Sequence, residues 1–397
     1  MDEALENIDI GGVTLLRAAA KNWRSVVVVC DPDDYAPVLA EMQEGLPAES
    51  TRRSLAARAF GHTARYDALI VNYLAGDDEL PVEAALPLRR SRVLRYGENP
   101  HQSASLYSWP DGSGFDLGAC EQLGGPDLSY NNFMDVDAAI GVVAEFEETA
   151  ACAVKHTNPC GAAVGATPVE AFERAYQGDP VSIYGGVVAL NATVDVDVVN
   201  FIREVGLFLE VIVAPDYTPD ALEGLAARKK LRVLRMDGSA FSNPPDYRTG
   251  RFLRGGLMMG SADTGVVDAR EWKVAGSRAP DDASLEDARF AWAVCRHTKS
   301  NAIVIAKDRA VVGVGAGQMN RISSARLAIE AAGDRSVGAC MASDGFLPFP
   351  DVAELAARAG LGLLVQPGGS IRDGEVVAAA DEAGMAMMFT GRRHFKH

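Results

Sequence analysis

Short apolar runs alternate with stretches of helical spacing along most of the chain. The β-branched run at 26–30 (VVVVC) ends at Asp31-Pro32-Asp33, which predicts a buried strand followed by a turn. Similar short runs occupy residues 151–154, 187–190, 211–214, 302–305, 311–314 and 361–365. Helical spacing is found at residues 51–73, 133–148, 168–178, 218–229, 283–297, 323–332, 352–359 and 373–383. This alternation predicts an α/β fold in which helices cover a mixed or parallel sheet.

Composition narrows the class of protein. A chain of 397 residues predicts two or three domains with ample apolar residues for their cores. The formal net charge of −16 disfavours a general nucleic-acid binder, which needs a basic surface. It still permits a small anionic substrate, because a local group of Arg and Lys side chains binds phosphate inside an acidic protein.

Cysteine usage and hydropathy indicate the compartment. The six cysteines are scattered and form no CxxC pair, which is typical of reduced cytosolic thiols. No apolar run approaches the about 18 residues that a membrane helix needs. The acidic start MDEALE lacks the basic region of a signal peptide. We therefore expect a cytoplasmic protein that does not span a membrane.

The first segment with candidate chemistry follows the apolar run at 151–154. Lys155 and His156 end this predicted strand and enter the Pro/Gly loop TNPCG. Polar groups at the carboxyl ends of strands usually line the ligand crevice of an α/β sheet, and an imidazole there offers a base near neutral pH. A loop His beside a surface Lys explains the same residues. Cys160 as a nucleophile lacks support, because no Cys-His-Asn spacing accompanies it.

Two further segments carry an Arg and an Asn with candidate roles. Arg95 lies in LRYGENPHQ, where its planar guanidinium suits a phosphate, although a structural turn with a surface Arg fits equally. Asn301 lies in KSNAIV and suits donation to a carbonyl oxygen that gains charge, or else a turn at a strand edge.

Glycines follow in Gly313–Arg321 (GVGAGQMNR) and permit close approach of a ligand to backbone N–H groups. Gln318 replaces the third glycine of a dinucleotide fingerprint, which argues against a Rossmann site.

The remaining segments are ambiguous alone. Residues 342–351 (ASDGFLPFPD) resemble a Pro-rich loop before a helix, and residues 392–397 (RRHFKH) resemble a frayed basic tail. Pro159–Ala162 (PCGA) begins the PCxxC signature of zinc deaminases, but the second Cys and the His-x-Glu motif are absent. The sequence therefore predicts no zinc site.

Taken in order, these segments resemble the transformylase half of the AICAR formyltransferase/IMP cyclohydrolase family of purine biosynthesis (AICAR is aminoimidazole carboxamide ribonucleotide). The matching motifs are RYGENPHQ, KHTNPCG, KSNAIV, GAGQMNR, SDGFLPFPD and RRHFKH, together with SYNNFMD at 129–135 and YGGVVAL at 184–190. The resemblance runs from about residue 5 to residue 397 and depends on the order of the whole set.

The resemblance implies transfer of a formyl group from 10-formyltetrahydrofolate, as co-substrate, to the 5-amino group of AICAR. By similarity, His156 takes the amine proton, Lys155 assists charge development at the folate N10 or the oxyanion, and Asn301 holds the formyl oxygen. Arg95 and Arg393 clamp the phosphate. The other residues implied to line the AICAR and folate pockets are Tyr96, Asn132, Glu210, Arg321, Phe346 and, on the folate side, Asp351.

The resemblance also implies an architecture. Residues 80–262 and 263–397 would form two cytidine-deaminase-like α/β units without zinc, and an intertwined homodimer would place active sites between subunits. Residues 1–79 would be the remnant of a methylglyoxal-synthase-like cyclohydrolase domain, of which roughly a hundred residues are missing. Asp9 and Lys21 match two catalytic residues of that domain. Half a site cannot position a substrate, so we expect no cyclohydrolase activity unless a separate polypeptide supplies it.

Three alternatives stay open at the level of sequence. The chain could transfer formyl to a different amino-ribonucleotide, or bind nucleotides as a non-catalytic regulator. A zinc deaminase is disfavoured by the ligand spacing.

Overall fold

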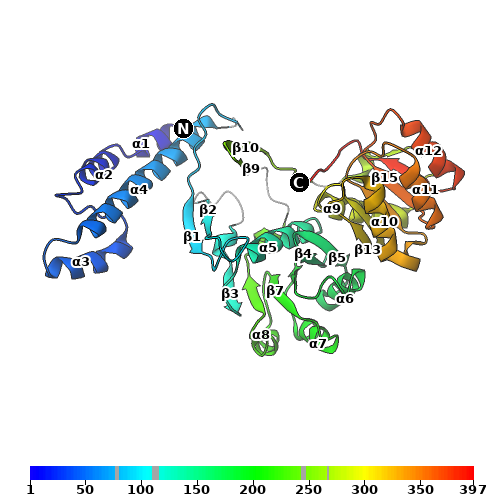
Figure 1. Ribbon diagram of the computed structural model, residues 1–397, viewed down its shortest axis with the longest axis horizontal. Helices are drawn as coiled ribbons and strands as arrows, with labels where there is room; N and C mark the ends of the chain where they lie inside the picture. Colours follow the sequence, from blue (N-terminus) through cyan, green and yellow to red (C-terminus); the bar gives the residue numbers. More distant parts are fainter. Residues whose placement is uncertain (77–79, 110–115, 243–246, 266–267) are drawn as a thin grey trace. The chain divides into compact units, whose positions relative to one another are not determined.

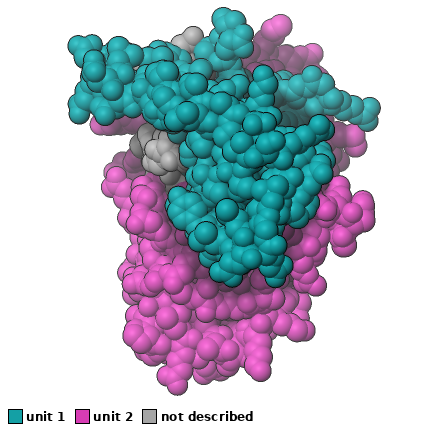
Figure 2. Space-filling view, turned by 90° about the vertical axis from the view of Figure 1, so that its left-hand side faces the viewer, with its two compact units in different colours: residues 1–90, 107–113, 248–261 teal, residues 91–106, 114–247, 262–397 magenta. Residues whose placement is uncertain are grey.

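The structure, a computed structural model, describes residues 1–76, 80–109, 116–242, 247–265 and 268–397. It divides into two compact units, which Figure 2 shows in different colours. Unit 1 consists of residues 1–90, 107–113 and 248–261, and unit 2 of residues 91–106, 114–247 and 262–397. Among the described residues, no helix is both long and apolar enough to cross a membrane.

Helices make up most of unit 1. They are α1 (Asp2–Asn7), α2 (Gly11–Lys21), α3 (Tyr35–Gln43) and α4 (Glu49–Ala75). Their small core consists of Ala20, Val28, Ala56 and Ala59. The strand predicted at 26–30 is wrong: the segment buries Val28 but belongs to no strand. A β-branched run becomes a strand only where another strand pairs with it, and no described strand lies beside this one.

Two small two-stranded sheets and several short helices accompany the larger elements. One sheet pairs β1 (Arg89–Val93) with β2 (Ser105–Ser108), and the other pairs β9 (Arg248–Leu253) with β10 (Gly256–Ser261). The 3-10 helices are Pro32–Asp34, Leu117–Ala119, Gly238–Phe241, Ala269–Glu271 and Gly333–Ser336.

Unit 2 is built around a mixed sheet of twelve strands, and the same order of elements occurs in it twice. Figure 1 shows its helices and strands coloured along the sequence. The first copy runs β3 (Glu121–Gly124), α5 (Tyr130–Val143), β4 (Ala150–Lys155), β5 (Asn158–Val164), α6 (Pro168–Gly178), β6 (Gly186–Leu190), α7 (Val196–Glu204), β7 (Leu209–Ala214), α8 (Pro219–Ala226), β8 (Arg232–Arg235). The second runs β11 (Lys273–Val274), α9 (Asp282–Arg296), β12 (Ile303–Lys307), β13 (Ala310–Gly315), α10 (Arg321–Ala332), β14 (Cys340–Ser343), α11 (Asp351–Arg358), β15 (Leu363–Gln366), α12 (Asp373–Glu382), β16 (Ala386–Phe389).

The strand order makes this repeat explicit. Across the sheet it is β11-β16-β15-β14-β12-β13-β5-β4-β6-β7-β8-β3, so each half is the reverse of the other. Each copy has an antiparallel hairpin, three parallel strands and an antiparallel edge strand. The copies meet where Ala310 of β13 pairs with Ala163 of β5. The predicted α/β class with a mixed, helix-covered sheet is confirmed.

Helices form a layer on each face of the sheet. On one face α5 and α9 share a single core that runs through both copies and includes Val136, Val154, Trp292 and Val304. On the other face the first copy packs α6, α7 and α8, and the second copy packs α10, α11 and α12, over separate cores. The face of α5 and α9 therefore joins the copies through buried apolar area.

Glycines let two helices of the opposite face approach their strands closely. A Cβ on Gly161 of β5 would lie 2.0 Å from the Ala175 carbonyl oxygen of α6, and one on Gly313 of β13 would lie 2.1 Å from that of Ala328 in α10. The glycine at 313 thus permits the close approach of α10 to β13.

Candidate active site

The predicted site residues of unit 2 gather along one side of its sheet, where strands of both copies begin or end. We call this side an edge of the sheet, as distinct from its outermost strands. The end of β4 lies there beside the start of β5, because Lys155 pairs with Asn158. The ends of β13 and β14 reach the same edge beside the start of β12, since Ile303 pairs with both Gly315 and Ser343. Because β13 and β5 are antiparallel neighbours, the two copies present these strand ends side by side.

Lys155 and His156 lie at a tight turn between β4 and β5. His156 and Thr157 have positive φ angles of 52° and 62°, which L-residues rarely adopt unless neighbours hold them. The Thr157 N–H donates to Asp135 Oδ1 of α5 at 2.7 Å. Burial raises the pKa of the Asp135 carboxyl above its ordinary value, although this hydrogen bond opposes the shift. The His156 side chain is exposed and makes no hydrogen bond within the described residues.

The Lys155 ammonium is anchored at the start of β6. Its Nζ donates to the carbonyl oxygens of Gly185 at 2.9 Å and Tyr184 at 3.4 Å. An ammonium has three hydrogens, so this anchoring leaves one for a ligand. A Cβ on Gly185 would lie 3.4 Å from that Nζ, at a φ of 68° that also favours glycine.

One side chain links this turn to the second copy. Asn158 Nδ2 donates to the His156 carbonyl oxygen at 3.2 Å, and Asn158 Oδ1 accepts from the Lys299 N–H at 3.0 Å. Lys299 begins the segment that carries Asn301, whose Nδ2 donates to the Gln318 carbonyl oxygen at 2.8 Å. The structure therefore brings the Lys155–His156 turn and the Asn301 segment to adjoining positions.

A cavity of about 260 Å³ opens beside Lys155, between the two copies' hairpins. Its lining residues are Lys155, Asn158, Pro159, Cys160, Gly178, Asp179, Ser182, Gly313, Val314, Ala316 and Ala331. Burial, with a contribution from Asp179, raises the pKa of the Cys160 thiol to about 12. A thiol with such a pKa stays protonated at neutral pH, so the geometry gives no support to Cys160 as a nucleophile.

Asn132 and Glu210 form a second group at the same edge. The pairing of β7 with β6 skips Glu210 between Leu209 and Val211, which makes Glu210 a bulge residue. Bulges change the direction of a side chain, and here Glu210 Oε2 accepts from Asn132 Nδ2 at 2.9 Å. Asn132 is itself fixed in the capping box that starts α5 with Ser129.

Sequence reasoning missed Arg232, which joins this group from the start of β8. Only 8% of Arg232 is exposed, and its Nε donates to the Asp127 carbonyl oxygen at 3.1 Å. Burial lowers the pKa of Arg232, and the neighbouring Glu210 opposes that shift. The guanidinium of Arg95 lies 5.7 Å from the ring centre of Tyr96, in the same group. A lone Arg inside the apolar run LRVL was the available signal.

Arg321 and Arg393 form a third group around an aromatic ring. Arg321 Nη2 donates to the fully buried Asp344 at 2.8 Å, and its Nε donates to Ser343 Oγ at 3.2 Å. The guanidinium groups of Arg321 and Arg393 lie 5.5 and 4.7 Å from the ring centre of Phe395. The C-terminal RRHFKH segment thus makes cation–π contacts near the end of β14, so the alternative of a frayed tail does not apply to Arg393 and Phe395.

The structure leaves Phe346 and Asp351 without such partners. Phe346 is 41% exposed, and Asp351 Oδ1 accepts from the Val352 N–H at the start of α11. In the part of the chain that is described, Asp351 makes no hydrogen bond to the Lys155 turn.

The predicted remnant residues lie in unit 1. Asp9 Oδ1 accepts from the Gly12 N–H at 3.0 Å, and the Asp9 N–H donates to the Tyr66 hydroxyl at 2.8 Å. Lys21 ends α2 and is exposed. The Asp9 side chain therefore satisfies a backbone N–H in the first turn of α2.

No group of three or more His, Cys, Asp or Glu side chains suited to a metal ion occurs in residues 1–76, 80–109, 116–242, 247–265 and 268–397. The polar groups at strand ends define an α/β protein with a crevice at the edge of its sheet, the place where such proteins bind ligands.

Comparison with known proteins identifies the family. A model of the AICARFT/IMPCHase bienzyme family matches residues 19–331. The bifunctional purine biosynthesis proteins PurH of Halalkalibacterium halodurans and of Bacillus cereus strain AH820 are each 48% identical over 398 residues. That of Bacillus subtilis strain 168 is 48% identical over 400 residues, and each match covers 100% of this chain and 77% of the relative. The chain belongs to the AICARFT/IMPCHase bienzyme family.

Proposed function

We propose that this protein is a folate-dependent AICAR formyltransferase, which transfers formyl from 10-formyltetrahydrofolate to the 5-amino group of AICAR in purine biosynthesis. The observation that carries the proposal is the meeting of the Lys155–His156 turn with the Asn301 segment at one sheet edge. The names of the relatives add support, since all are bifunctional purine biosynthesis proteins.

The chemistry explains why these three side chains are needed. The AICAR amine is a poor nucleophile, because its lone pair delocalises into the imidazole and carboxamide. As its nitrogen attacks the formyl carbon, His156 takes the amine proton, and the oxyanion that forms is held by Asn301. Lys155 then assists departure of the folate N10, which leaves with a proton as the C–N bond breaks.

The flanking groups would bind the substrates. Arg95 and Arg393 supply guanidinium groups for the ribonucleotide phosphate, and Tyr96, Asn132 and Glu210 supply polar contacts to AICAR. Arg321 and Phe346 would line the AICAR and folate pockets, and Asp351 would contact the folate side. We propose no zinc or other resident metal, and no nucleic-acid or membrane partner.

We extend the proposal to architecture and location. The two copies in unit 2 would be cytidine-deaminase-like units within residues 80–262 and 263–397, and residues 1–79 would be related to a methylglyoxal-synthase-like domain. The protein would act as a cytoplasmic homodimer. We propose that the chain by itself does not close the ring of formyl-AICAR.

One assay tests the proposal. Purified protein is incubated with AICAR and 10-formyltetrahydrofolate, and formyl-AICAR, tetrahydrofolate and IMP are followed together. We expect equal amounts of formyl-AICAR and tetrahydrofolate and no IMP. Binding of AICAR without formyl transfer would instead indicate a nucleotide-binding regulator. Faster transfer to another amino-ribonucleotide would correct the acceptor, and IMP formation would contradict the loss of cyclohydrolase activity.

A further inference from the structure

We propose that Asn158 is a positioning residue, which sets the spacing between the His156 turn and the segment that carries Asn301. This inference rests on the proposed function and extends it to a residue outside the substrate-contacting set. Asn158 uses both ends of its amide: Nδ2 donates to the His156 carbonyl oxygen and Oδ1 accepts from the Lys299 N–H. It is the first residue of β5, so the sheet fixes its backbone.

The second copy of the fold shows that the turn itself does not need this side chain. There the equivalent pair is Lys307 and Ala310, which flank Asp308 and Arg309. Those two turn residues have positive φ angles of 52° and 54°, nearly the same as in the first copy. Ala310, at the position of Asn158, has no polar side chain, and yet the same turn forms.

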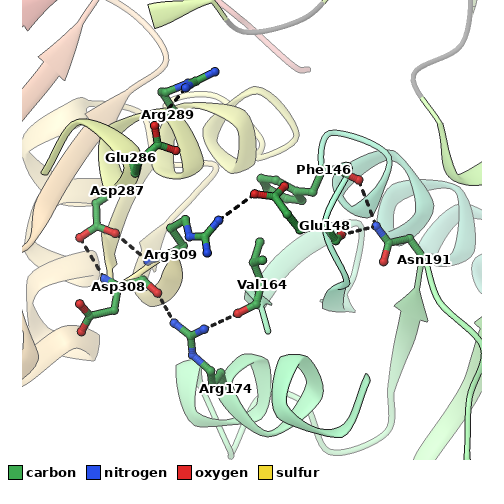
Figure 3. Close-up of polar contacts among 10 residues, drawn as sticks. All are labelled: Phe146, Glu148, Val164, Arg174, Asn191, Glu286, Asp287, Arg289, Asp308 and Arg309. Carbon is green, nitrogen blue, oxygen red and sulfur yellow. Dashed lines mark hydrogen bonds and ion pairs between the residues drawn. The ribbon is translucent and has the colours of Figure 1, made fainter. Parts of the chain in front are cut away.

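What holds the turn in both copies is a carboxylate from the preceding helix. In the second copy Asp287 of α9 accepts from the N–H groups of Asp308 and Arg309 at 2.9 and 2.6 Å, as Figure 3 shows. In the first copy Asp135 of α5 accepts from the Thr157 N–H. The carboxylate therefore stabilises the turn, whereas the Asn158 side chain connects the turn to the backbone of Lys299.

The two copies are connected by different kinds of contact at the two opposite ends of their strands. At the edge in Figure 3, Arg309 pairs with Glu148 at 2.8 Å, and Arg174 donates to the carbonyl oxygens of Val164 and Asp308. Charged side chains thus close that edge. At the edge of His156 a neutral amide makes the connection, so no fixed charge from the linker competes with a charged substrate.

Loss of this link should act on catalysis more than on binding or folding. Without Asn158 the turn and the Lys299 segment keep their own local contacts but lose the hydrogen bonds that fix their separation. A displacement of about 1 Å between reacting groups costs about 100-fold in rate. For N158A we therefore expect kcat to fall about 10- to 100-fold, with a smaller change in KM for AICAR and little change in Tm.

Two further variants make the test specific. N158D keeps an acceptor for Lys299 but puts a negative charge beside the His156 carbonyl oxygen and the anionic substrate, so its kcat should be no higher than that of N158A. D287A removes the carboxylate from the equivalent turn at the other edge. It should lower Tm and leave kcat unchanged, which separates loosening of a turn from misplacement of the site.

The outcomes distinguish this inference from the proposed function. Absence of formyl transfer in the wild type contradicts the function itself. Wild-type transfer together with an unchanged kcat in N158A, or a change confined to KM, overturns the positioning role alone. A kcat of N158D well above that of N158A would overturn the role of the neutral amide.

Discussion

His156 combines a fixed backbone with a free side chain. Its carbonyl oxygen accepts from Asn158, the next residue donates to Asp135, and its imidazole is exposed. A general base contributes about 10²–10⁴-fold to a rate. We therefore expect H156A to reduce formyl transfer by at least 100-fold at unchanged Tm, measured by steady-state kinetics and thermal unfolding. Normal turnover in this variant would remove His156 from the mechanism.

Lys155 offers a matched comparison within the same chain. Lys307 ends the equivalent strand of the second copy and donates to the Val337 carbonyl oxygen at 2.8 Å. Loss of a donor that stabilises developing charge costs about 10²–10³ in rate. We expect K155A to lose that much kcat and K307A to keep the wild-type value. Equal losses in the two variants would mean that both lysines act on stability only.

Cys160 lines the cavity beside Lys155 but should be chemically inert. Burial raises the pKa of its thiol to about 12, and its Sγ donates to the Ala153 carbonyl oxygen at 3.4 Å. Since the thiolate is the reactive form, the thiol should resist iodoacetamide at pH 8, and C160S should retain full activity. Mass spectrometry of the alkylated protein checks the first expectation. Rapid labelling at Cys160 with loss of activity would contradict it.

Elements whose ends are marked by capping residues were predicted best. The helix predicted at 168–178 is α6 without any shift, because Thr167 caps it and Pro168 starts it. Helix α7 at Val196–Glu204 was not predicted, since its Val-rich start resembles a strand until Asp195 is recognised as the N-cap. The strand predicted at 26–30 is absent, because β-branched residues favour a strand but do not provide the neighbouring strand with which it must pair.

The candidate site was predicted in part. Lys155 and His156 follow from the rule that polar residues after a buried strand line a crevice. The direction of Glu210 depends on a bulge between β6 and β7, and the meeting of Asn158 with Lys299 depends on the pairing of β5 with β13. Neither the bulge nor that pairing leaves a local pattern in the sequence, because both arise from contacts between distant residues.

A buried ion pair joins the ends of α5 and α9. Glu145, whose side chain is 2% exposed, accepts from Arg296 and lies 2.6 Å from His297 Nε2. Burial opposes ionisation of Glu145, but the hydrogen bonds from His297 and Arg296 outweigh it and lower its pKa. E145Q leaves Arg296 without its counter-charge, so we expect a loss of about 3–5 kcal/mol in the free energy of unfolding at pH 7.

The same pair predicts a pH dependence of stability. The folded-state pKa of Glu145 is below the unfolded value of about 4.3, so its stabilisation is present above that pH and is lost as pH falls through the folded value. Urea unfolding between pH 7 and 3 should show this loss in the wild type and a shallower slope in E145Q. The exposed pair Glu286–Arg289 is the control, since E286Q should cost at most about 1 kcal/mol.

The two units differ in how much apolar surface they bury. Among the described residues, the apolar cluster of unit 1 is small (Ala20, Val28, Ala56 and Ala59), whereas unit 2 has three extended cores on the two faces of its sheet. Local opening costs least where few apolar contacts must be broken. We expect amides of α2 and α4 to exchange with deuterium much faster than those of β4 and β12. Equal protection, measured by mass spectrometry, would mean that unit 1 gains stability from contacts beyond its own core.

The reversed strand order gives this molecule an internal reference for its own active site. One hairpin turn occurs twice, once with an exposed imidazole and once with the Arg309–Glu148 ion pair and the hydrogen bonds of Arg174, and the φ angles of the two turns are similar. Two residues at matching positions of the copies can therefore be compared, which distinguishes residues that the fold requires from residues that serve the reaction. The second copy has alanine at residue 310, so the turn does not require a polar residue at this position. Asn158, at the matching position of the first copy, is therefore available to serve the reaction.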